Sequence, residues 1–560
     1  MLDAKPTSTP SGPTKTYKGP AHMPPKVAKV VTPHQVRTLP FKVASPLVLG
    51  AEKALVAGSG GAKVGDNPYL GGNFAPVEDE RFDGWLEVVE GELPKALNGA
   101  FLRNGPNPAV QPNGKYHWFD GDGMVHAVRI KDGKASYVNR YVDTARLRQE
   151  REVGYPQFIK FGDSQGVWGV GHALLKQIKE EIGILQPGKY GSGTGNTALL
   201  FHAKRLLALH EGDLPYVLRL ACQGILETLG RLTYGDKVGS MTAHPKVDPK
   251  TGELFFFEYS VGRAPYCWYA LADASGALVH HYPVPLEQPV MMHDFALTED
   301  YVIFYDCPLV FDPKLMVKEN ATPFVFDKSR PSRFGVLPRY AKDASQIRWF
   351  EAEPMVAFHT ANAWQEGSQV KVCLCTFEEF SLAMDEFTPS KMPYLTEVTM
   401  DMSAGAGASA SVRRVADVAG DFPRVPDSMI GRKSRYSYLA TMVANVDTPY
   451  FDGVAKLDLE AGSPSEALVG KVQFGPSSFG GEAYFVPAGE GQGAEDAGYL
   501  VTFVHDEKAG HTELVVFDAK TMSCKPVARV RMPRRVPYGF HCLWVSEKDL
   551  QTQLEPAHSD

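Results

Sequence analysis

The most constraining feature of this sequence is a long succession of short apolar runs that are rich in β-branched and aromatic residues. Each run is bounded by Gly, Pro, Asp or Asn, as β-strands usually are. Examples are LFFFEYS (254–260), YVIFYD (301–306), KVCLCTF (371–377), YSYLATMV (436–443), YLVTFVHD (499–506) and ELVVFDA (513–519). Short strands at this spacing over ~450 residues predict a closed or radially repeated β-sheet, because closure removes exposed strand edges.

Two segments depart from the strand pattern. Residues 170–185 (VGHALLKQIKEEIGIL) and 215–232 (PYVLRLACQGILETLGRL) have apolar residues at the i, i+3, i+4 spacing of amphipathic helices. We therefore expect two inserted helices that lie across one face of the β body and cover a site. The sequence contains no WD-type or kelch-type repeat, so a propeller would have to be degenerate in sequence.

Residues 1–60 differ in composition from the rest of the chain. They are rich in Pro, Ser, Thr and Lys, and Asp3 is the only acidic residue before Glu52. Such a stretch buries too little apolar area to fold by itself, so we expect either a disordered tail or an arm that wraps the main body. Because it is basic and poor in acids, it also resembles the remnant of an organelle transit peptide. The sequence predicts an N-terminal arm (1–60) and one folded domain (61–560).

The charge balance argues against a nucleic-acid partner. The chain has 58 Lys plus Arg and 65 Asp plus Glu, a formal net charge of −7, whereas polyanion binders normally show a basic face. No apolar window reaches the ~18–20 residues needed to span a bilayer. The seven cysteines are an odd number spread thinly along 560 residues, which indicates a reducing compartment. We expect a cytoplasmic protein, or a plastid protein if the arm includes transit sequence.

Four of the sixteen histidines lie in apolar, β-rich settings where a charge would be costly. They are His244 in MTAHPKVDP, His293 in VMMHDFALT, His359 in MVAFHTANAW and His541 in VPYGFHCLW. Because they come from distant parts of the chain, they can converge only at a centre such as a propeller axis. Each one alone fits a hydrogen-bonded core histidine, and the set of four fits a metal site. The pattern by itself leaves both interpretations open.

Specific segments of the chain resemble the carotenoid cleavage dioxygenase family, which includes the retinal-pigment isomerohydrolase of vertebrates. The segments span nearly all of the expected folded domain. They are NGAFLRNGPNP (98–108), YHWFDGDGMVHAV (116–128), NTALLFHAKRLLALHEG (196–212), TAHPKVDP (242–249), MMHDFALT (291–298), FHTANAWQEG (358–367), GGEAYFVP (480–487), EDAGYLVTFVHDE (495–507) and RVPYGFHCLW (535–544). The stretch RFGVLPRYAKD (333–343) looks most like the plant 9,10(9′,10′)-cleaving subfamily.

The resemblance implies a fold and a cofactor. The family fold is all-β with a few inserted helices: a seven-bladed β-propeller with a cap of helices and loops over one face. In the family, four histidines near the axis hold one Fe(II) per chain, and the matching positions are His244, His293, His359 and His541. Four neutral imidazoles suit a first-row metal such as Fe(II) and leave coordination positions open for O₂.

The resemblance also implies side chains that support the ligands. Three family carboxylates accept hydrogen bonds from three of the histidines, and they match Glu211 in ALHEG, Asp421 in GDFPRV and Glu482 in GGEAYF. Position 421 departs from the family, which normally has Glu before F-P-R. Because Asp is one methylene shorter, it must approach by a backbone shift or bind through a water; otherwise it is an ordinary turn acid. Thr197 in the N-T-A motif matches a residue beside the open iron positions, or else is a strand threonine.

The implied activity is cleavage of a C=C bond of a carotenoid or apocarotenoid with O₂, which gives two carbonyl products. Subfamily resemblance favours the 9,10 (9′,10′) bond. A long polyene needs an apolar, aromatic tunnel. Because carotenoids reside in lipid, residues 41–56 and the two expected helices are candidates for contact with a membrane surface, and a lid packed on the propeller is the alternative. We expect a monomer.

Three other functions stay open at this point. Stilbene-cleaving relatives hold a phenol with a polar pair that includes a Lys, and in NRYVDTARLRQE (139–150) the place where we expect that Lys is occupied by Ala145. A non-catalytic carotenoid-binding propeller is disfavoured because the four histidines are intact. An isomerohydrolase is disfavoured because its sequence neighbours are animal-like, whereas this chain reads as plant-like.

Overall fold

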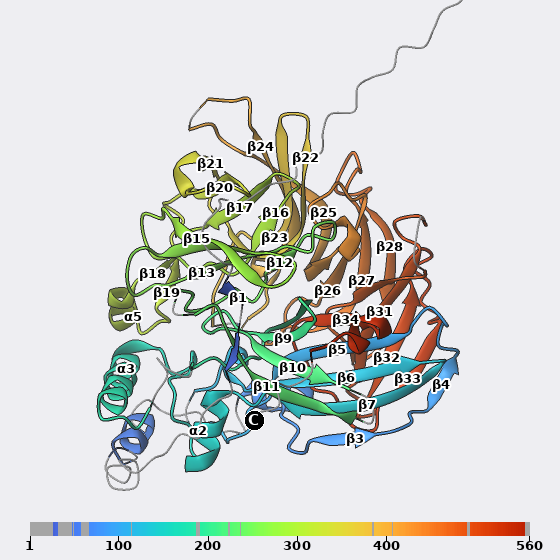
Figure 1. Ribbon diagram of the computed structural model, residues 1–560, viewed down its shortest axis with the longest axis horizontal. Coiled ribbons are helices and arrows are strands. Elements are labelled where there is room, and N and C mark those ends of the chain that lie inside the picture. The colour runs from blue at the N-terminus through green and yellow to red at the C-terminus, as the bar shows by residue number, and fades with distance from the viewer. Residues whose placement is uncertain are drawn as a thin grey trace, which may run out of the picture.

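The computed structural model describes residues 26–27, 29–31, 48, 50–57 and 67–554, except 114, 186–190, 222–223, 236, 384–385, 406 and 490–492. Its strands form antiparallel sheets that are arranged around a common centre (Figure 1). The helices α2 (Ala145–Val153), α3 (Gly166–Glu181) and α5 (Pro313–Glu319) gather at one side of them. Among the described residues, no helix combines the length and the apolar character needed to cross a bilayer.

The first three blades are built from consecutive hairpins, with two added edge strands in blade 1 and one each in blades 2 and 3. Blade 1 joins β34 (Cys542–Ser546), β5 (Gly99–Pro106), β6 (Gly123–Lys131), β7 (Lys134–Tyr141) and β3 (Arg81–Asp83). Blade 2 joins β8 (Ala198–His202), β9 (Arg205–Leu209), β10 (Tyr216–Leu220), β11 (Leu226–Thr233) and β2 (Lys29–Val31). Blade 3 joins β12 (Lys246–Val247), β13 (Leu254–Tyr259), β14 (Cys267–Ala272), β15 (Ala277–Val284) and β1 (Lys26–Val27).

The other sheets complete the ring. Blade 4 joins β16 (Phe295–Leu297), β17 (Tyr301–Asp306), β20 (Ser332–Pro338) and β21 (Arg348–Ala352), beside the separate hairpin of β18 (Leu309–Phe311) and β19 (Phe324–Phe326). A seven-stranded sheet follows, with β22 (Val356–Glu366), β23 (Gln369–Phe377), β24 (Tyr394–Asp401), β25 (Ser411–Arg424), β26 (Tyr436–Met442), β27 (Phe451–Asp458) and β28 (Leu468–Gln473). The last sheet has β29 (Ser478–Phe479), β30 (Tyr484–Pro487), β31 (Gly498–Asp506), β32 (His511–Asp518), β33 (Ala528–Arg531) and β4 (Val88–Gly91).

The seven-stranded sheet contains two blades, because β25 serves both. Its first part, residues 411–419, pairs with β24 as the outer strand of blade 5. Its last part, residues 420–424, pairs with β26 as the inner strand of blade 6. The ring closes where β34 from the end of the chain pairs with β5 of blade 1, with Cys542 opposite Arg103. The prediction of a seven-bladed propeller is confirmed.

The packing between blades explains why the strand sequences are apolar on both faces. In β13, Phe256 packs with Leu207 and Tyr234 of blade 2. Its neighbour Phe257 points the other way, because side chains alternate along a strand, and packs against Phe295 of blade 4. A strand buried on both faces reads as a continuous apolar run and not as an alternating one.

One of the two helix predictions is wrong. Residues 170–185 largely coincide with α3, which begins four residues earlier. Residues 215–232, however, form the strands β10 and β11 of blade 2. The chain turns between them where Ala221 N–H donates to Ile225 O at 2.8 Å, with Gly224 in the left-handed conformation at φ 75°. Since blade 2 is packed on both faces, its apolar residues are not confined to alternate positions and imitate a helical pattern.

The described parts of residues 1–60 lie against two blades of the propeller and against α3. β1 pairs with β15, and β2 pairs with β11, so the segment adds edge strands to two blades. Residues 50–57 are helical, and Glu52 Oε2 accepts a hydrogen bond from Lys179 Nζ of α3 at 2.7 Å. Both side chains of this ion pair are almost fully buried. The division of the chain at residue 60 stays a prediction.

Candidate metal centre

The four histidines lie on, or just before, the inner strands of four different blades. His244 and His293 lie just before β12 and β16, His541 immediately precedes β34, and His359 belongs to β22. Each of these strands is the end strand of its sheet. The propeller therefore brings together four residues that are far apart in the sequence.

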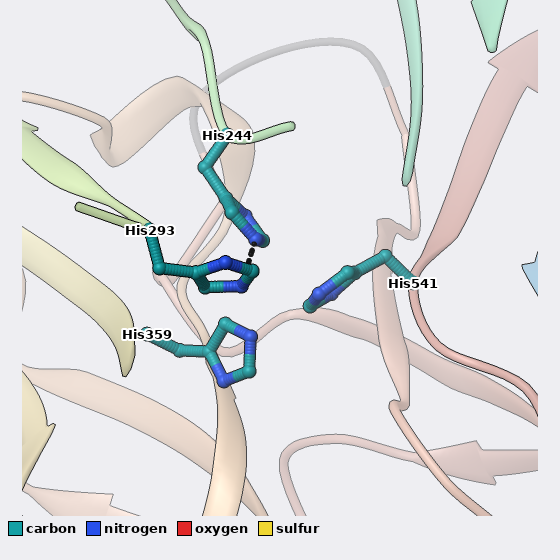
Figure 2. A group of neighbouring side chains, drawn as sticks. All are labelled: His244, His293, His359 and His541. Atoms are coloured by element: carbon teal, nitrogen blue, oxygen red, sulfur yellow. Dashed lines mark hydrogen bonds between the residues drawn. The ribbon is translucent and has the colours of Figure 1, made fainter. Parts of the chain in front are cut away.

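The four rings point toward one another from separate segments (Figure 2). One potential ligand atom from each ring lies within 4.8 Å of the others. The Nε2 atoms of His244 and His293 are 2.9 Å apart. Two nitrogens that bind one ion at right angles, each at ~2.1 Å, are about 3 Å apart, so this spacing fits two adjacent ligands of one metal. Among the described residues, this is the one cluster of His, Cys, Asp or Glu side chains with such geometry.

Three of the histidines have a carboxylate behind them. His293 Nδ1 lies 2.9 Å from Glu211 Oε2, and His359 Nδ1 lies 2.9 Å from Asp421 Oδ1. The third pair is His541 Nδ1 and Glu482 Oε1 at 3.2 Å, the longest of the three contacts. Since the Nδ1–H donates to the carboxylate, the lone pair of each ring lies on Nε2, which faces the centre.

His244 is held in a different way. Among the described residues it has no carboxylate partner. Its backbone N–H donates to Thr242 Oγ1 at 3.1 Å, and that hydroxyl donates to the carbonyl of His293 at 3.0 Å. Thr242 thereby links the backbones of two histidines from adjacent blades. Burial lowers the pKa of His244 well below its usual range, and the neighbouring histidines lower it further, so the ring is neutral and can donate its lone pair.

The carboxylates are ionised although they are buried. Burial raises the pKa of Glu211, but the hydrogen bonds that it accepts, first from His293 and then from Tyr259, help to outweigh this effect, and the net pKa is lowered. For Glu482, burial is likewise outweighed, first by the charge of Arg424, whose Nε lies 3.8 Å from Oε1. An ionised acceptor orients an imidazole and increases its basicity.

Asp421 reaches its histidine without a bridging water. The register between β25 and β26 shifts between Asp421 and Arg424, and Phe422 has a left-handed φ of 53°. This irregularity is a change of backbone path, which is what a short carboxylate requires to make a direct contact. The same Oδ1 accepts the N–H of Phe422 at 2.8 Å. Burial raises the pKa of Cys375, and the charge of Asp421 and a hydrogen bond to it raise it further.

A cavity opens on one side of the group of four histidines, and we call it the aromatic cavity. It borders His293, His359 and His541, but not His244. Its other walls are mostly aromatic: Trp118, Phe119, Phe358, Phe377, Phe380, Phe387, Phe422, Phe451 and Phe540. Thr197 lines it as well; its hydroxyl donates to Asn196 Oδ1 at 2.9 Å, and its carbonyl accepts the N–H of His541 at 3.3 Å.

A second cavity lies along the propeller axis on the other side, and we call it the axial cavity. It is lined by residues from the inner strands of all seven blades and borders His244 and His541. Its lining includes the charged residues Lys246, Arg424, Asp427 and Asp549. The four histidines therefore separate a mainly aromatic cavity from one whose lining mixes apolar residues with four charged ones.

The structure thus brings together all eight residues that the family resemblance singled out. It also adds two that sequence reasoning missed. Thr242 lies two residues before His244, in a T-A-H sequence that offered a local signal. Tyr259, whose hydroxyl donates to Glu211 Oε1 at 2.9 Å, gave no signal, because it lies on β13 far from Glu211 in the sequence.

Comparisons with known proteins agree with this architecture. The family model described as retinal pigment epithelial membrane protein matches residues 74–546. A Crocus sativus protein named carotenoid 9,10(9′,10′)-cleavage dioxygenase is 46% identical over 500 residues, which cover 87% of this chain and 90% of that protein. A Pisum sativum protein named carotenoid 9,10(9′,10′)-cleavage dioxygenase 1 is 46% identical and covers 87% of this chain and 91% of its own length.

A solved structure supports the same conclusion. The crystal structure of Pseudomonas brassicacearum lignostilbene dioxygenase has a TM-score of 0.75 and 28% sequence identity, and the match covers 86% of this chain and 99% of that chain. The chain therefore belongs to the carotenoid oxygenase family, the family of the retinal pigment epithelial membrane protein.

Proposed function

We propose that this protein is a non-haem iron(II) dioxygenase that cleaves a C=C bond of a carotenoid or apocarotenoid with O₂, at the 9,10 (9′,10′) position. The observation that carries this proposal is an aromatic cavity that borders three of four convergent histidines. The two relatives at 46% identity, which are named for this cleavage, support the choice of bond.

The donor set fits iron(II). His244, His293, His359 and His541 would hold one ion per chain, and a bound iron(II) would supply the binding and activation of O₂. The side chains around it supply position. Glu211, Asp421 and Glu482 fix three imidazole rings, so none of them is free to act as a general base.

The cavity wall suits a polyene. Aromatic faces hold a flat, conjugated chain by dispersion and stacking, and they exclude water from the bond that reacts. We propose that Thr197 lies beside the coordination positions left open by the four histidines. Its position next to His541 in the cavity lining supports this role, and its methyl group keeps that place apolar while its hydroxyl is engaged with Asn196.

A stilbene-cleaving activity is the second candidate, because the lignostilbene dioxygenase shares the fold and 28% of the sequence. The cavity argues against it. Among the described residues, its lining contains no Lys, Arg or Tyr that would hold a phenol. Ala145 is not in the lining at all; it is the first residue of α2, and its N–H donates to Tyr216 Oη at 3.1 Å. Position 145 is therefore wrong as the place to look for a phenol-binding Lys.

We also propose that α3 contacts a lipid surface. Val167, Leu174 and Ile178 are 60%, 57% and 48% exposed, and they form one apolar stripe along the helix. An aromatic series leads away from the cavity: Phe119, which lines it, is followed by Phe161 and Phe324 with ring centroids 6.5 Å apart at each step. Phe161 lies shortly before α3, so substrate from a membrane would meet an apolar path. The monomeric state and the compartment stay predictions.

Vesicle binding tests the lipid contact. The double variant Leu174→Asp, Ile178→Asp should lose most co-sedimentation with phosphatidylcholine vesicles, because two charges on the stripe oppose insertion. Val469→Asp changes a half-exposed valine of β28 and serves as the control. Equal binding by all three proteins would show that α3 is only a lid.

Product analysis tests the activity. The purified, iron-loaded protein is incubated with O₂ and, separately, with β-carotene, an apocarotenal and resveratrol, and product masses are measured. Cleavage of the polyenes at the 9,10 bond and no cleavage of resveratrol is the expected result. Resveratrol cleavage alone would replace the proposal with the stilbene activity, and binding without cleavage would indicate a carotenoid-binding protein.

A further inference from the structure

His210 is a polar residue of the aromatic cavity that the proposed chemistry does not use. It follows β9 directly and precedes Glu211, and both side chains line the cavity. Because Glu211 contacts His293 at 2.9 Å, His210 lies close to the candidate metal centre. It is half-buried.

The hydrogen bonds of His210 define which ring nitrogen is available. Its Nδ1 accepts the backbone N–H of Gly212 at 3.1 Å. Burial lowers the pKa of His210, although the nearby charges of Glu211 and Asp213 oppose this. In the neutral ring the proton is then on Nε2, which makes Nε2 a donor. Among the described residues, this nitrogen has no partner, and it is not one of the buried unpaired atoms.

The other donors around the cavity are engaged or inaccessible. Asn196 donates both amide hydrogens, to the carbonyls of Phe119 and Gly121. Thr197 donates its hydroxyl hydrogen to Asn196. The indole N–H of Trp118 has no partner, but the atom is buried and does not reach the cavity surface. Within the described lining, the Nε2–H of His210 is therefore the donor that a ligand can reach.

We propose that the Nε2–H of His210 binds an oxygen atom of the substrate and so makes the cavity favour oxygenated polyenes over hydrocarbon ones. This inference rests on the proposed function and names the substrate class within it. The acceptor is a hydroxyl or carbonyl oxygen, and both accept the same hydrogen bond. A free donor in an otherwise apolar cavity favours a ligand that satisfies it, because a hydrocarbon in the same place leaves the N–H desolvated and unpaired.

The test compares substrates on the full-length, iron-loaded protein. kcat/KM is measured for β-carotene, its 3,3′-dihydroxy derivative and a β-apocarotenal with the wild type, His210→Phe and His210→Gln. The Phe variant removes the donor and keeps an aromatic ring, whereas Gln keeps a donor. Met442→Leu, another change in the cavity lining, is the matched control. Binding under nitrogen, followed by quenching of tryptophan fluorescence, provides a readout that does not depend on turnover.

We expect His210→Phe to lower the ratio of oxygenated to hydrocarbon kcat/KM, and of the corresponding affinities, by roughly five- to tenfold. Gln should restore most of the ratio, and Met442→Leu should leave it unchanged. A loss for the diol alone identifies a hydroxyl as the acceptor, and a loss for the aldehyde alone identifies a carbonyl. An unchanged ratio in the Phe variant, or equal losses in Phe and Gln, overturns the inference.

The same measurements distinguish failure of the proposed function from failure of this inference. If the wild type cleaves none of the three polyenes, both proposals fail. If it cleaves them and the ratio does not respond to His210, only the present inference fails. Should His210→Phe not accumulate as folded protein, His210→Leu repeats the comparison with a smaller side chain.

Discussion

The histidines that border the aromatic cavity and the histidine that faces only the axial cavity are held in place differently. On the side of the aromatic cavity, His293, His359 and His541 each have an ionised carboxylate behind the ring. On the side of the axial cavity, which His541 also borders, His244 has no carboxylate partner among the described residues and is held through its backbone by Thr242.

This difference separates two tasks. A carboxylate fixes the orientation of an imidazole and raises its basicity, and here that support is given to the rings that border the space proposed for substrate. His244 contributes a neutral ligand whose position follows from the loop that carries it. Substitutions on one side at a time therefore separate the two contributions.

The largest effect is expected from removing a ligand. His293→Ala and His244→Ala should both lose iron and activity, because three remaining ligands hold the ion poorly. They should differ in stability, since His293→Ala leaves the buried Glu211 without its histidine, at a cost of roughly 1–3 kcal/mol, whereas His244→Ala leaves no carboxylate unpaired. Metal analysis and urea unfolding of the two metal-free variants measure this. Full iron occupancy with turnover in either variant would remove that residue from the ligand set.

A smaller effect is expected from Asp421. Asp421→Asn keeps an acceptor but removes the charge, so iron retention or kcat/KM should fall about 10- to 100-fold. Asp421→Glu should be tolerated if the irregular backbone at Phe422 leaves room for one more methylene. Iron occupancy and kcat/KM are measured for the three proteins side by side. If they are indistinguishable, Asp421 is an ordinary turn acid, and the contact with His359 has no functional weight.

A still smaller effect on iron retention is expected from Arg424, which lines the axial cavity. Arg424 lies in the lining of the axial cavity and lowers the pKa of Glu482 by its charge. Arg424→Met should weaken iron retention about three- to tenfold, because a less firmly ionised Glu482 orients His541 less well. The control is Arg413→Met, since Arg413 pairs with Glu397 away from the centre. Equal dialysis rates of iron from both variants would contradict this role.

The smallest effect on iron retention is expected from removing the thiol of Cys375. Burial raises the pKa of the Cys375 thiol, and the charge of Asp421 raises it further. Because the thiol therefore stays protonated beside that carboxylate, Cys375→Ala should weaken iron retention about two- to threefold, as the loss of one weak donor predicts. Cys373→Ala removes an equally buried thiol from the same strand and should cost similar stability without changing the iron affinity. A competition assay with a chelator compares the two. The same loss in both variants would make Cys375 a packing residue only.

Much of the fold was predictable because its strands are short and apolar. The runs at 254–260 and 499–506 correspond to β13 and β31, since β-branched and aromatic side chains fit a sheet that is packed on both faces. Burial on both faces also explains why a helix was wrongly predicted for residues 215–232, since apolar residues at every spacing resemble a helical pattern. Local pattern does not distinguish a fully buried strand from a helix.

The centre was predictable from the family resemblance and not from spacing. His244, His293, His359 and His541 are recognisable by their motifs, but only the closure of seven blades places them together. The direct contact of Asp421 depends on one residue, Phe422, in an unusual backbone conformation. The hydrogen bond from Tyr259 to Glu211 forms because blade 3 packs beside the loop that follows β9. Such contacts across blades leave no local trace in a sequence.

The convergence of four histidines predicts that they bind one iron together. Iron K-edge X-ray absorption, combined with metal analysis of the purified full-length protein, tests this directly. One iron per chain is expected, with a nearest shell that contains four imidazole nitrogens and no sulfur. An iron content that is unaffected by loss of His244, His293, His359 or His541, or a nearest shell with sulfur or with fewer imidazoles, would contradict the four-histidine centre.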